Sequence, residues 1–278
     1  MCFAEKLEGS NDMARWIKEI QPDYYNRYSY AFNDEMLWQN GNIYVMDNHR
    51  SATWCWLQQC KYGDRYNFMH IDRHYDMSKY YYEEDLIPLL ENPHMDYEEY
   101  SNLIRQDGEY KSLSWDNYIL FAYDLRPDWF LTNVFLTHKE GDVCVGWRGN
   151  VMRFIEKEPS DIINQIRRYL MEITNDTDGV LDGTSELKWI VNIDLDIIFN
   201  TSEEGKLFEF YDEDTIRDIA KLIQNAMDKI QVLTIAISPE FIAGVDMREK
   251  WNNGFKKLKI LAEEISFLRC FPHQHLII

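Results

Sequence analysis

Hydrophobic residues occur along the chain in short unbroken runs, each bounded by polar residues or glycine. Runs of this kind are typical of strands that are buried on both faces of a parallel sheet. We therefore expect strands at residues 42–47, 66–72, 133–138, 142–147, 188–196 and 231–238.

Between these runs, apolar positions recur at helical spacing instead. Residues 160–173 begin at Ser160, a suitable N-cap, and carry an isoleucine-rich stripe. Residues 212–230 begin with acidic side chains, which stabilise a helix N-terminus. A third helix is expected over about 248–266, and it is less regular because the Asn-Asn-Gly sequence ending at Gly254 interrupts it.

Strands that alternate with helices predict an α/β fold. The sheet is expected to be mostly parallel and covered by helices on both sides, which gives a three-layer α/β/α arrangement. No repeat, low-complexity tract or linker rich in proline, glycine or serine interrupts the chain. We expect a single domain over residues 1–278.

Polar side chains with metal-binding or acid–base chemistry follow four of the expected strands. In parallel sheets, binding sites lie at the carboxyl ends of the strands. An aspartate after one strand is weak evidence, because it is common there as a turn former or helix cap. Four strands that end in this way predict a site at that edge, built from Asp47, Asn48 and His49, from Asp72, His74 and Asp76, from Asp194 and Asp196, and from Glu240.

The spacing of these residues indicates a metal centre. Asp72, His74 and Asp76 alternate along the chain, so their side chains share a face at intervals of ~6.6 Å and can converge where the loop curls. Without cations, clustered aspartates would repel one another and some of their pKa values would rise. Two divalent ions would cancel the charge of four aspartates. A shell of carboxylate and imidazole without thiolate suits manganese, and zinc, iron or cobalt could also occupy it.

Composition and charge limit the partners and the compartment. Lysine and arginine number 29 against 48 acidic residues, a net charge of −19, which repels nucleic acid and anionic lipid and favours cationic groups. Acidic composition also serves solubility. The five cysteines form no CxxC pair, and the sequence shows no signal peptide and no apolar segment of ~18 residues. We expect a cytoplasmic protein that binds neither nucleic acid nor membrane.

The order of these motifs resembles that of the arginase and ureohydrolase superfamily: His49, then Asp72-Arg73-His74-Tyr75-Asp76, then Asp194-Leu195-Asp196. The wider segments VMDNHR, HIDRHYD, WIVNIDLDIIF and TIAISPEF are similar to a family of arginase-like fold in which some bacterial members are peptide arginases. Those enzymes hydrolyse arginine side chains within a peptide to ornithine. The resemblance spans roughly residues 42–244, and it implies an arginase-like fold.

The resemblance also implies a centre of two Mn²⁺ ions. One ion would be held by His49, Asp72, Asp76 and Asp194, and the other by Asp72, His74, Asp194 and Asp196. Asp72 and Asp194 would then bridge the two ions, which would share and activate a water.

The implied reaction is hydrolysis of a guanidinium group to urea and a primary amine. Glu240 matches the glutamate that binds the guanidinium, and a carboxylate is its natural bidentate partner. Asp76 would pass the proton from the nucleophile to the departing amine. The substrate would be an arginine-containing peptide or a small guanidine.

Departures from the superfamily pattern argue against free arginine. Free-arginine enzymes carry Gly-Gly-Asp-His at the first histidine, whereas residues 47–50 are Asp-Asn-His-Arg. The loop that recognises the α-amino and α-carboxylate groups is not recognisable, and residues 112–118 are the nearest candidate. The proton-shuttling histidine has no clear match, although His94 and His138 are available. His70 could lie behind the metal ligands and support them or pack in the core, and we expect core packing.

Other functions stay open. The same ligand types serve binuclear phosphoesterases and amide deacetylases, but the motif order here differs from the former, and the latter bind a single zinc with fewer acids. A metal-bound, non-catalytic peptide-binding protein is the third alternative. The acidic, tyrosine-rich segments 79–86 and 95–102 are expected to be solvated, or to attract a basic peptide. The histidine pair at residues 273–275 is expected to lie on the surface.

Overall fold

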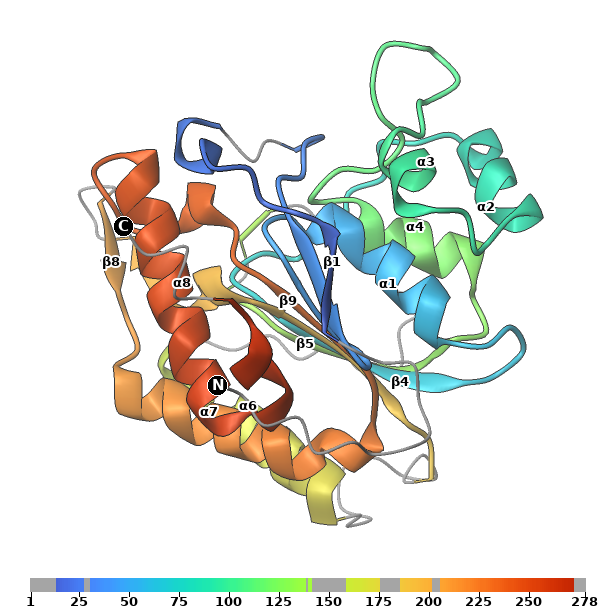
Figure 1. Cartoon of the computed structure of the whole chain (residues 1–278). Coiled ribbons are helices and arrows are strands. Elements are labelled where there is room, and N and C mark those ends of the chain that lie inside the picture. The colour runs from blue at the N-terminus through green and yellow to red at the C-terminus, as the bar shows by residue number, and fades with distance from the viewer. Residues whose placement is uncertain are drawn as a thin grey trace.

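The protein, seen in a computed structural model, is built on one large sheet (Figure 1). The structure describes residues 14–27, 31–138, 140–141, 159–175, 186–201 and 206–272. Seven strands lie in the order β1-β2-β3-β9-β6-β4-β5. Their bounds are β1 Arg15–Lys18, β2 Leu37–Asn40, β3 Ile43–Met46, β4 Tyr66–Ile71, β5 Phe130–Leu136, β6 Trp189–Asp194 and β9 Ile230–Ala236.

The sheet is mostly parallel, as the sequence predicts. Strands β3, β9, β6, β4 and β5 run parallel to one another, whereas β1 and β2 are antiparallel additions at one edge. A separate two-stranded sheet pairs β7 (Phe199–Thr201) with β8 (Leu207–Glu209).

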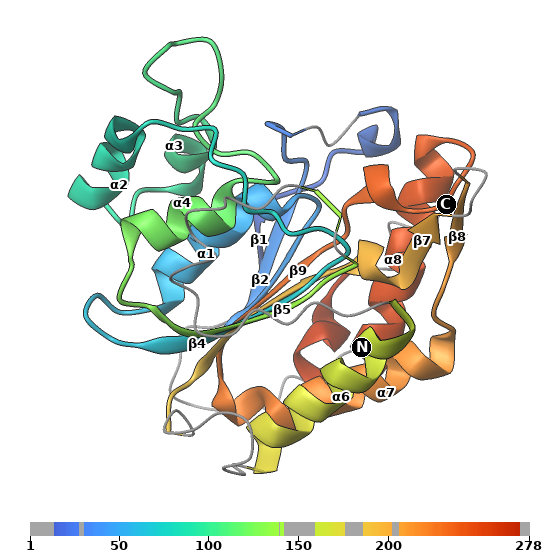
Figure 2. The same cartoon turned by 180° about the vertical axis from the view of Figure 1, so that it is seen from behind.

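Helices cover both faces of the large sheet, which gives three layers (Figures 1 and 2). On one face lie α1 (Ala52–Gln59) and α4 (Tyr118–Leu125), with α2 (Ile87–Glu91) and α3 (Tyr97–Ser101) farther out; on the other lie α6 (Pro159–Asn175), α7 (Glu213–Ala226) and α8 (Met247–Glu264). Neighbouring residues of a strand enter different cores: Phe68 of β4 packs with α1 and α4, and Met69 packs with α6, α7 and α8. The sheet therefore separates two hydrophobic cores.

Most of the predicted elements are confirmed. Five of the six expected strands are β3, β4, β5, β6 and β9, and the sixth, residues 142–147, lies outside the described residues. Expected helices 160–173, 212–230 and 248–266 are α6, α7 and α8. Among the described residues, no helix has the length and apolar character that crossing a bilayer requires.

Helix α8 is continuous, contrary to the expected interruption at Gly254. A Cβ at this position would meet Ile237 Cγ2 at 2.3 Å and Ile242 Cδ1 at 3.0 Å. Glycine is present because the helix passes directly over the chain that leaves β9. This contact holds α8 against the segment that carries Ser238 into the site described below.

Replacing Gly254 by alanine tests this close approach. A methyl group has no room there, so Gly254→Ala should cost about 1–3 kcal/mol despite the better helix propensity of alanine. Urea unfolding measures the loss, with Lys256→Ala, at an exposed position, as the control on the same helix. An increase in stability on alanine substitution would contradict the packing described.

Residues 47–50, which follow β3, are clamped to the segment before β2. The Asp47 carboxylate accepts hydrogen bonds from the backbone N–H groups of Glu35 and Met36, both at 2.8 Å. Asn48 donates to the Asn33 carbonyl at 2.8 Å. Asp47 thus has a structural role, because it fixes the turn that presents the next residue but one, His49.

A buried ion pair also stabilises the turn formed by residues 47–50. Arg50 and Asp34 are 1% and 3% exposed, and their side chains are paired directly. Asp34 also accepts hydrogen bonds from Lys18 at 2.8 Å and from the Tyr97 hydroxyl at 2.9 Å. Arg50 donates to the Ser101 carbonyl at 2.9 Å. Both charges are therefore compensated, as buried charges must be.

Neutralising Asp34 should destabilise the protein. Burial alone would raise the pKa of the Asp34 carboxyl, but Arg50 and Lys18 lower it below its ordinary value. The pair therefore contributes fully above about pH 4 and is lost as the pH falls through the lowered pKa. At pH 7, Asp34→Asn should cost about 3–5 kcal/mol in urea unfolding, because the Arg50 charge stays buried without a partner. The double variant Asp34→Leu with Arg50→Met should cost less than the single one, and a larger cost would contradict this role.

Candidate metal centre

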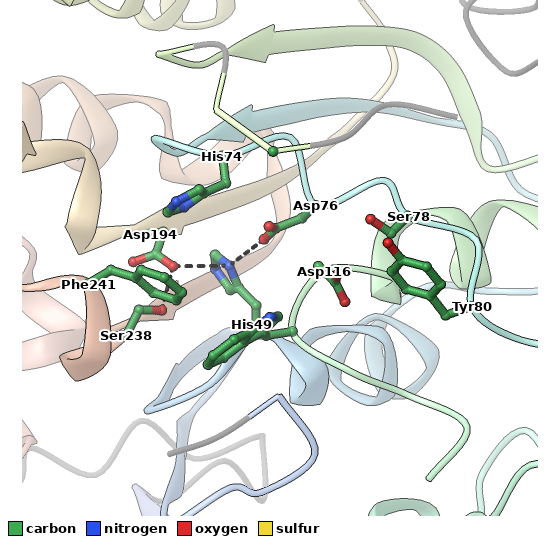
Figure 3. A pocket seen from close by; sticks show the side chains of 11 residues that line it. His49, His74, Asp76, Ser78, Tyr80, Asp116, Asp194, Ser238 and Phe241 are labelled. Carbon is green, nitrogen blue, oxygen red and sulfur yellow. Dashed lines mark hydrogen bonds and ion pairs between the residues drawn. The ribbon is translucent and has the colours of Figure 1, made fainter. Parts of the chain in front are cut away.

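The six predicted ligands converge at the carboxyl ends of three strands, β3, β4 and β6, and the chain that leaves β9 closes the site. Figure 3 shows four of the six ligands. One ligand stands on the short 3-10 helix after β3, three stand on the loop after β4, one ends β6, and one lies in the 3-10 helix Leu195–Ile198 that follows. In chain order they are His49, Asp72, His74, Asp76, Asp194 and Asp196.

His49 lies at the centre of three carboxylates. Its Nδ1 is 3.4 Å from Oδ2 of each of Asp72, Asp76 and Asp194. Its Nε2 lies 3.3 Å from the Ile193 carbonyl oxygen, which can only accept a hydrogen bond. A neutral His49 therefore carries its proton on Nε2 and turns the Nδ1 lone pair toward the carboxylates. A metal cation between them would satisfy the Nδ1 lone pair and all three carboxylates.

His74 forms the second half of the centre. Its Nδ1 is 2.9 Å from Asp196 Oδ2 and 3.5 Å from Asp72 Oδ1. Asp72, His74 and Asp196 offer ligand atoms within 4.8 Å of one another, and so do His49, Asp72 and Asp194. Asp72 belongs to both groups, which is what a bridging ligand requires. The bridging role of Asp194 stays a prediction.

Backbone N–H groups orient three of the carboxylates. Oδ1 of Asp72 accepts from His74 N at 2.6 Å, Oδ1 of Asp194 from Asp196 N at 2.9 Å, and Oδ1 of Asp196 from Arg73 N at 3.3 Å. The other oxygens, Asp72 Oδ2 and Asp196 Oδ2, are buried and receive no well-aligned hydrogen bond from the described residues, although imidazole nitrogens lie near them, His49 Nδ1 at 3.4 Å from the first and His74 Nδ1 at 2.9 Å from the second. Buried carboxylate oxygens without such a hydrogen bond are rare in proteins, so this set of oxygens and nitrogens fits divalent cations.

The clustered carboxylates repel one another, as the sequence predicts. Burial, together with the charges of Asp196 and Asp194, raises the pKa of Asp72 to about 6. Burial also raises the pKa of Asp76 to about 7, with a contribution from Asp72, and that of Asp194 to about 7, with a contribution from Asp196. Burial alone would raise the pKa of Asp196, but His74 and Arg73 together lower it below its ordinary value. The electrostatic problem is local, and cations would remove it.

A cavity of about 210 Å³ opens over four of the ligands, His49, His74, Asp76 and Asp194. Figure 3 shows these four around one space, between Phe241 and Ser238 on one side and Ser78, Tyr80 and Asp116 on the other. The remaining described lining residues are Trp115 and Gly141. The centre is therefore reachable by a small group or a side chain.

The candidate recognition segment 112–118 contributes two residues to the cavity wall. Trp115 meets Phe241 edge to face, with 5.0 Å between ring centroids. Asp116 is the one carboxylate in the described lining that is not a predicted ligand, and its Oδ1 accepts a hydrogen bond from the Ser114 hydroxyl at 2.6 Å. The sequence marked this segment, but it did not single out Asp116.

Glu240 lies beside the cavity. It lies in the 3-10 helix Pro239–Phe241, and its neighbours Ser238 and Phe241 line the cavity. Glu240 itself is not among the described lining residues, and its backbone oxygen accepts a hydrogen bond from Lys250 at 2.8 Å. Its role in binding substrate stays a prediction.

Two backbone outliers mark the cavity. Asp76, with φ 53°, and Ser238, with φ 47°, are the non-glycine residues of the described chain that have positive φ. Both line the cavity, and the Ser238 hydroxyl donates to Asp194 Oδ2. Left-handed backbone at such residues costs of order 1–3 kcal/mol and persists where the surroundings enforce it, often at functional sites.

The histidines considered beside the ligands differ in their surroundings. His70 is fully buried against Phe135, as expected for a core position, and it is also hydrogen-bonded to the ligand loop. With Asp72 and Asp76 it forms a third group that could hold an ion. His138 packs against Phe210 and Tyr211, and burial lowers its pKa to about 4.

Neither His138 nor His94, which is exposed, lines the described part of the cavity. The expected pair at residues 273–275 lies outside the described residues.

The tyrosine-rich acidic segments are only partly solvated. Tyr81, Tyr97 and Tyr100 are buried in the core, which corrects the expectation of a solvated face for these residues. Tyr82, Glu83 and Glu84 are exposed, as expected. Tyr80 lines the cavity, so the first segment contributes to the site instead of lying apart from it.

No family model, curated protein or solved structure matches this chain. The resemblance to the arginase superfamily therefore stays a prediction from motif order, and the geometry of the ligand cluster is the independent observation beside it.

Proposed function

We propose that this protein is a binuclear metal-dependent hydrolase that cleaves a guanidinium group to urea and an amine. The proposed substrate is an arginine side chain in a peptide, which would become ornithine. The observation that carries the proposal is the convergence of six carboxylate and imidazole ligands, four buried and two partly buried, beneath one small acidic cavity. The mostly parallel, three-layer fold is compatible with an arginase-like fold.

Two manganese ions are the proposed cofactors. His49, Asp72, Asp76 and Asp194 would hold one ion, and Asp72, His74, Asp194 and Asp196 would hold the other. Bound there, the pair would act as a Lewis acid and activate water at neutral pH.

The cavity supplies the groups that a guanidinium needs. A guanidinium stays charged, with a pKa above ~12, and its planar face stacks on aromatic rings. Trp115 and Phe241 offer such rings on the wall. Its five N–H donors can satisfy more than one carboxylate, so we propose Asp116 from the structure and Glu240 from the resemblance as its partners. Asp76 lines the same space and can carry a proton to the departing amine.

The charge of the cavity favours this substrate over a phosphate ester. Asp76, Asp116 and Asp194 line it, and none of the described lining residues is lysine or arginine. Phosphoryl transfer depends on cationic side chains or metal ions that neutralise the phosphate oxygens. An acidic wall instead attracts a cation. A non-catalytic, metal-bound peptide-binding protein is the remaining alternative, and turnover distinguishes it.

Removing Asp194 tests the metal centre. Asp194→Ala should abolish both metal loading and urea release, because this carboxylate is assigned to both ions. Elemental analysis and a urea assay with arginine, agmatine and arginine-containing peptides measure the two effects. Asp228→Ala, at an exposed acid, is the control. A fully active, metal-free Asp194 variant would refute the ligand assignment.

Parallel replacement of Asp116 and Glu240 tests the substrate site. Asp116→Asn and Glu240→Gln keep volume and remove charge, so both should spare the metals. Each should lower kcat/KM for a guanidinium substrate by about 10- to 100-fold, since a charge-assisted pair is lost. Elemental analysis and steady-state kinetics provide the readouts. Unchanged kinetics in either variant would remove that residue from the substrate site.

A further inference from the structure

Three polar side chains form a row across the sheet directly beneath the metal centre. His70 on β4 is the register partner of Asn192 on β6, and Asn192 is the partner of Thr234 on β9. All three are fully buried. On β4 and β6 the polar residue stands two positions before a predicted ligand, Asp72 or Asp194. Polar groups at this depth are retained only when they are hydrogen-bonded.

The direction of the hydrogen bonds in this row is set at Trp56 on α1. An indole N–H can only donate, and Trp56 Nε1 lies 3.3 Å from Thr234 Oγ1. The Thr234 hydroxyl proton must then point elsewhere, and its shortest acceptor is Asn192 Oδ1 at 2.6 Å. With Oδ1 engaged as an acceptor, the Asn192 amide turns its Nδ2 donors toward the Tyr118 hydroxyl at 2.9 Å and toward His70.

The donor from Asn192 determines the tautomer of His70. Asn192 Nδ2 lies 3.0 Å from His70 Nδ1, so Nδ1 accepts and the proton of the neutral imidazole is on Nε2. His70 Nε2 faces two acceptors, the His74 carbonyl oxygen at 3.1 Å and Asp72 Oδ2 at 3.5 Å. His70 thus presents an N–H to the ligand loop. It has no lone pair there to offer a metal ion.

We propose that this one-way chain of hydrogen bonds, from Trp56 through Thr234 and Asn192 to His70, makes His70 a positioning residue for the metal centre and excludes it from coordination. Its N–H holds the carbonyl of His74, whose own backbone N–H holds Asp72 at 2.6 Å. The inference rests on the proposed function in that it assumes metal ions at this centre. It also resolves an ambiguity, because His70, Asp72 and Asp76 would otherwise qualify as a ligand group.

Two substitutions at His70 separate the possible roles. A glutamine amide nitrogen reaches the position of the imidazole Nε2, so His70→Gln keeps a donor for the His74 carbonyl. The shorter amide of His70→Asn reaches only the Nδ1 position and leaves that carbonyl without a donor. Manganese titration should give His70→Gln an affinity within about threefold of the unaltered protein, and His70→Asn an affinity about 10- to 100-fold weaker.

Both other outcomes overturn the proposal. Equal losses in the two variants would mean that His70 is a ligand or merely fills space, because glutamine would then replace it no better than asparagine. No loss in either variant would mean that the row has no influence on the centre. Circular dichroism and urea unfolding of both variants check that each is folded when it is titrated.

The tautomer itself can be read without any substitution that risks misfolding. Long-range ¹H–¹⁵N correlation spectra of the metal-free protein should show His70 protonated at Nε2, with its signals assigned by their absence from the His70→Gln spectrum. A proton on Nδ1 would refute the chain. Neither the manganese titration nor the NMR spectrum depends on the release of urea as a product. A protein with this tautomer that binds manganese but releases no urea would therefore contradict the proposed function alone.

Discussion

Mutual repulsion among four aspartates, three buried and one partly buried, is the constraint on which the site depends. Asp72, Asp76, Asp194 and Asp196 meet at the carboxyl edge of the sheet, and burial with mutual repulsion raises the pKa of the first three. A fold gains nothing from such a cluster by packing alone, because desolvated like charges cost stability. Divalent cations convert this cost into a binding site, and backbone N–H groups already hold one oxygen of three of these carboxylates for that purpose.

The rest of the fold keeps those side chains in place. The Asp47 clamp and the buried Arg50–Asp34 pair fix the turn after β3, and α8 packs closely over the chain that leaves β9. Beneath the loop after β4, the row from Trp56 to His70 supplies a donor of fixed direction. Each element of the site therefore rests on a rigid strand end and on a second contact from a different part of the chain, which is how ligand geometry is kept within tenths of an ångström.

The sequence predicts those parts of this architecture that local pattern encodes. Strands such as β4 and β6 are mostly apolar runs with an aspartate at their end or directly after it, and runs of this kind predict both the sheet and the region of the six ligands. Helix α1 is not predicted by such patterns because six of its eight residues are buried, so it lacks an amphipathic period.

The position of Asp116 could not be predicted, because it lies on a loop that meets the ligands only in the folded chain. Glu240 follows the expected strand. Between them Ser238 has a left-handed backbone, and the sequence does not predict this turn. His70 and Asn192 did carry a signal, since each interrupts an apolar strand two residues before a ligand.

The central claim is that the cluster holds a pair of ions, and anomalous X-ray diffraction at the manganese edge tests it most directly. In crystals of the manganese-loaded protein, the account predicts two peaks about 3.5–4 Å apart, one beside His49 and one beside His74, with Asp72 between them. A single peak, or none among these side chains, would contradict it.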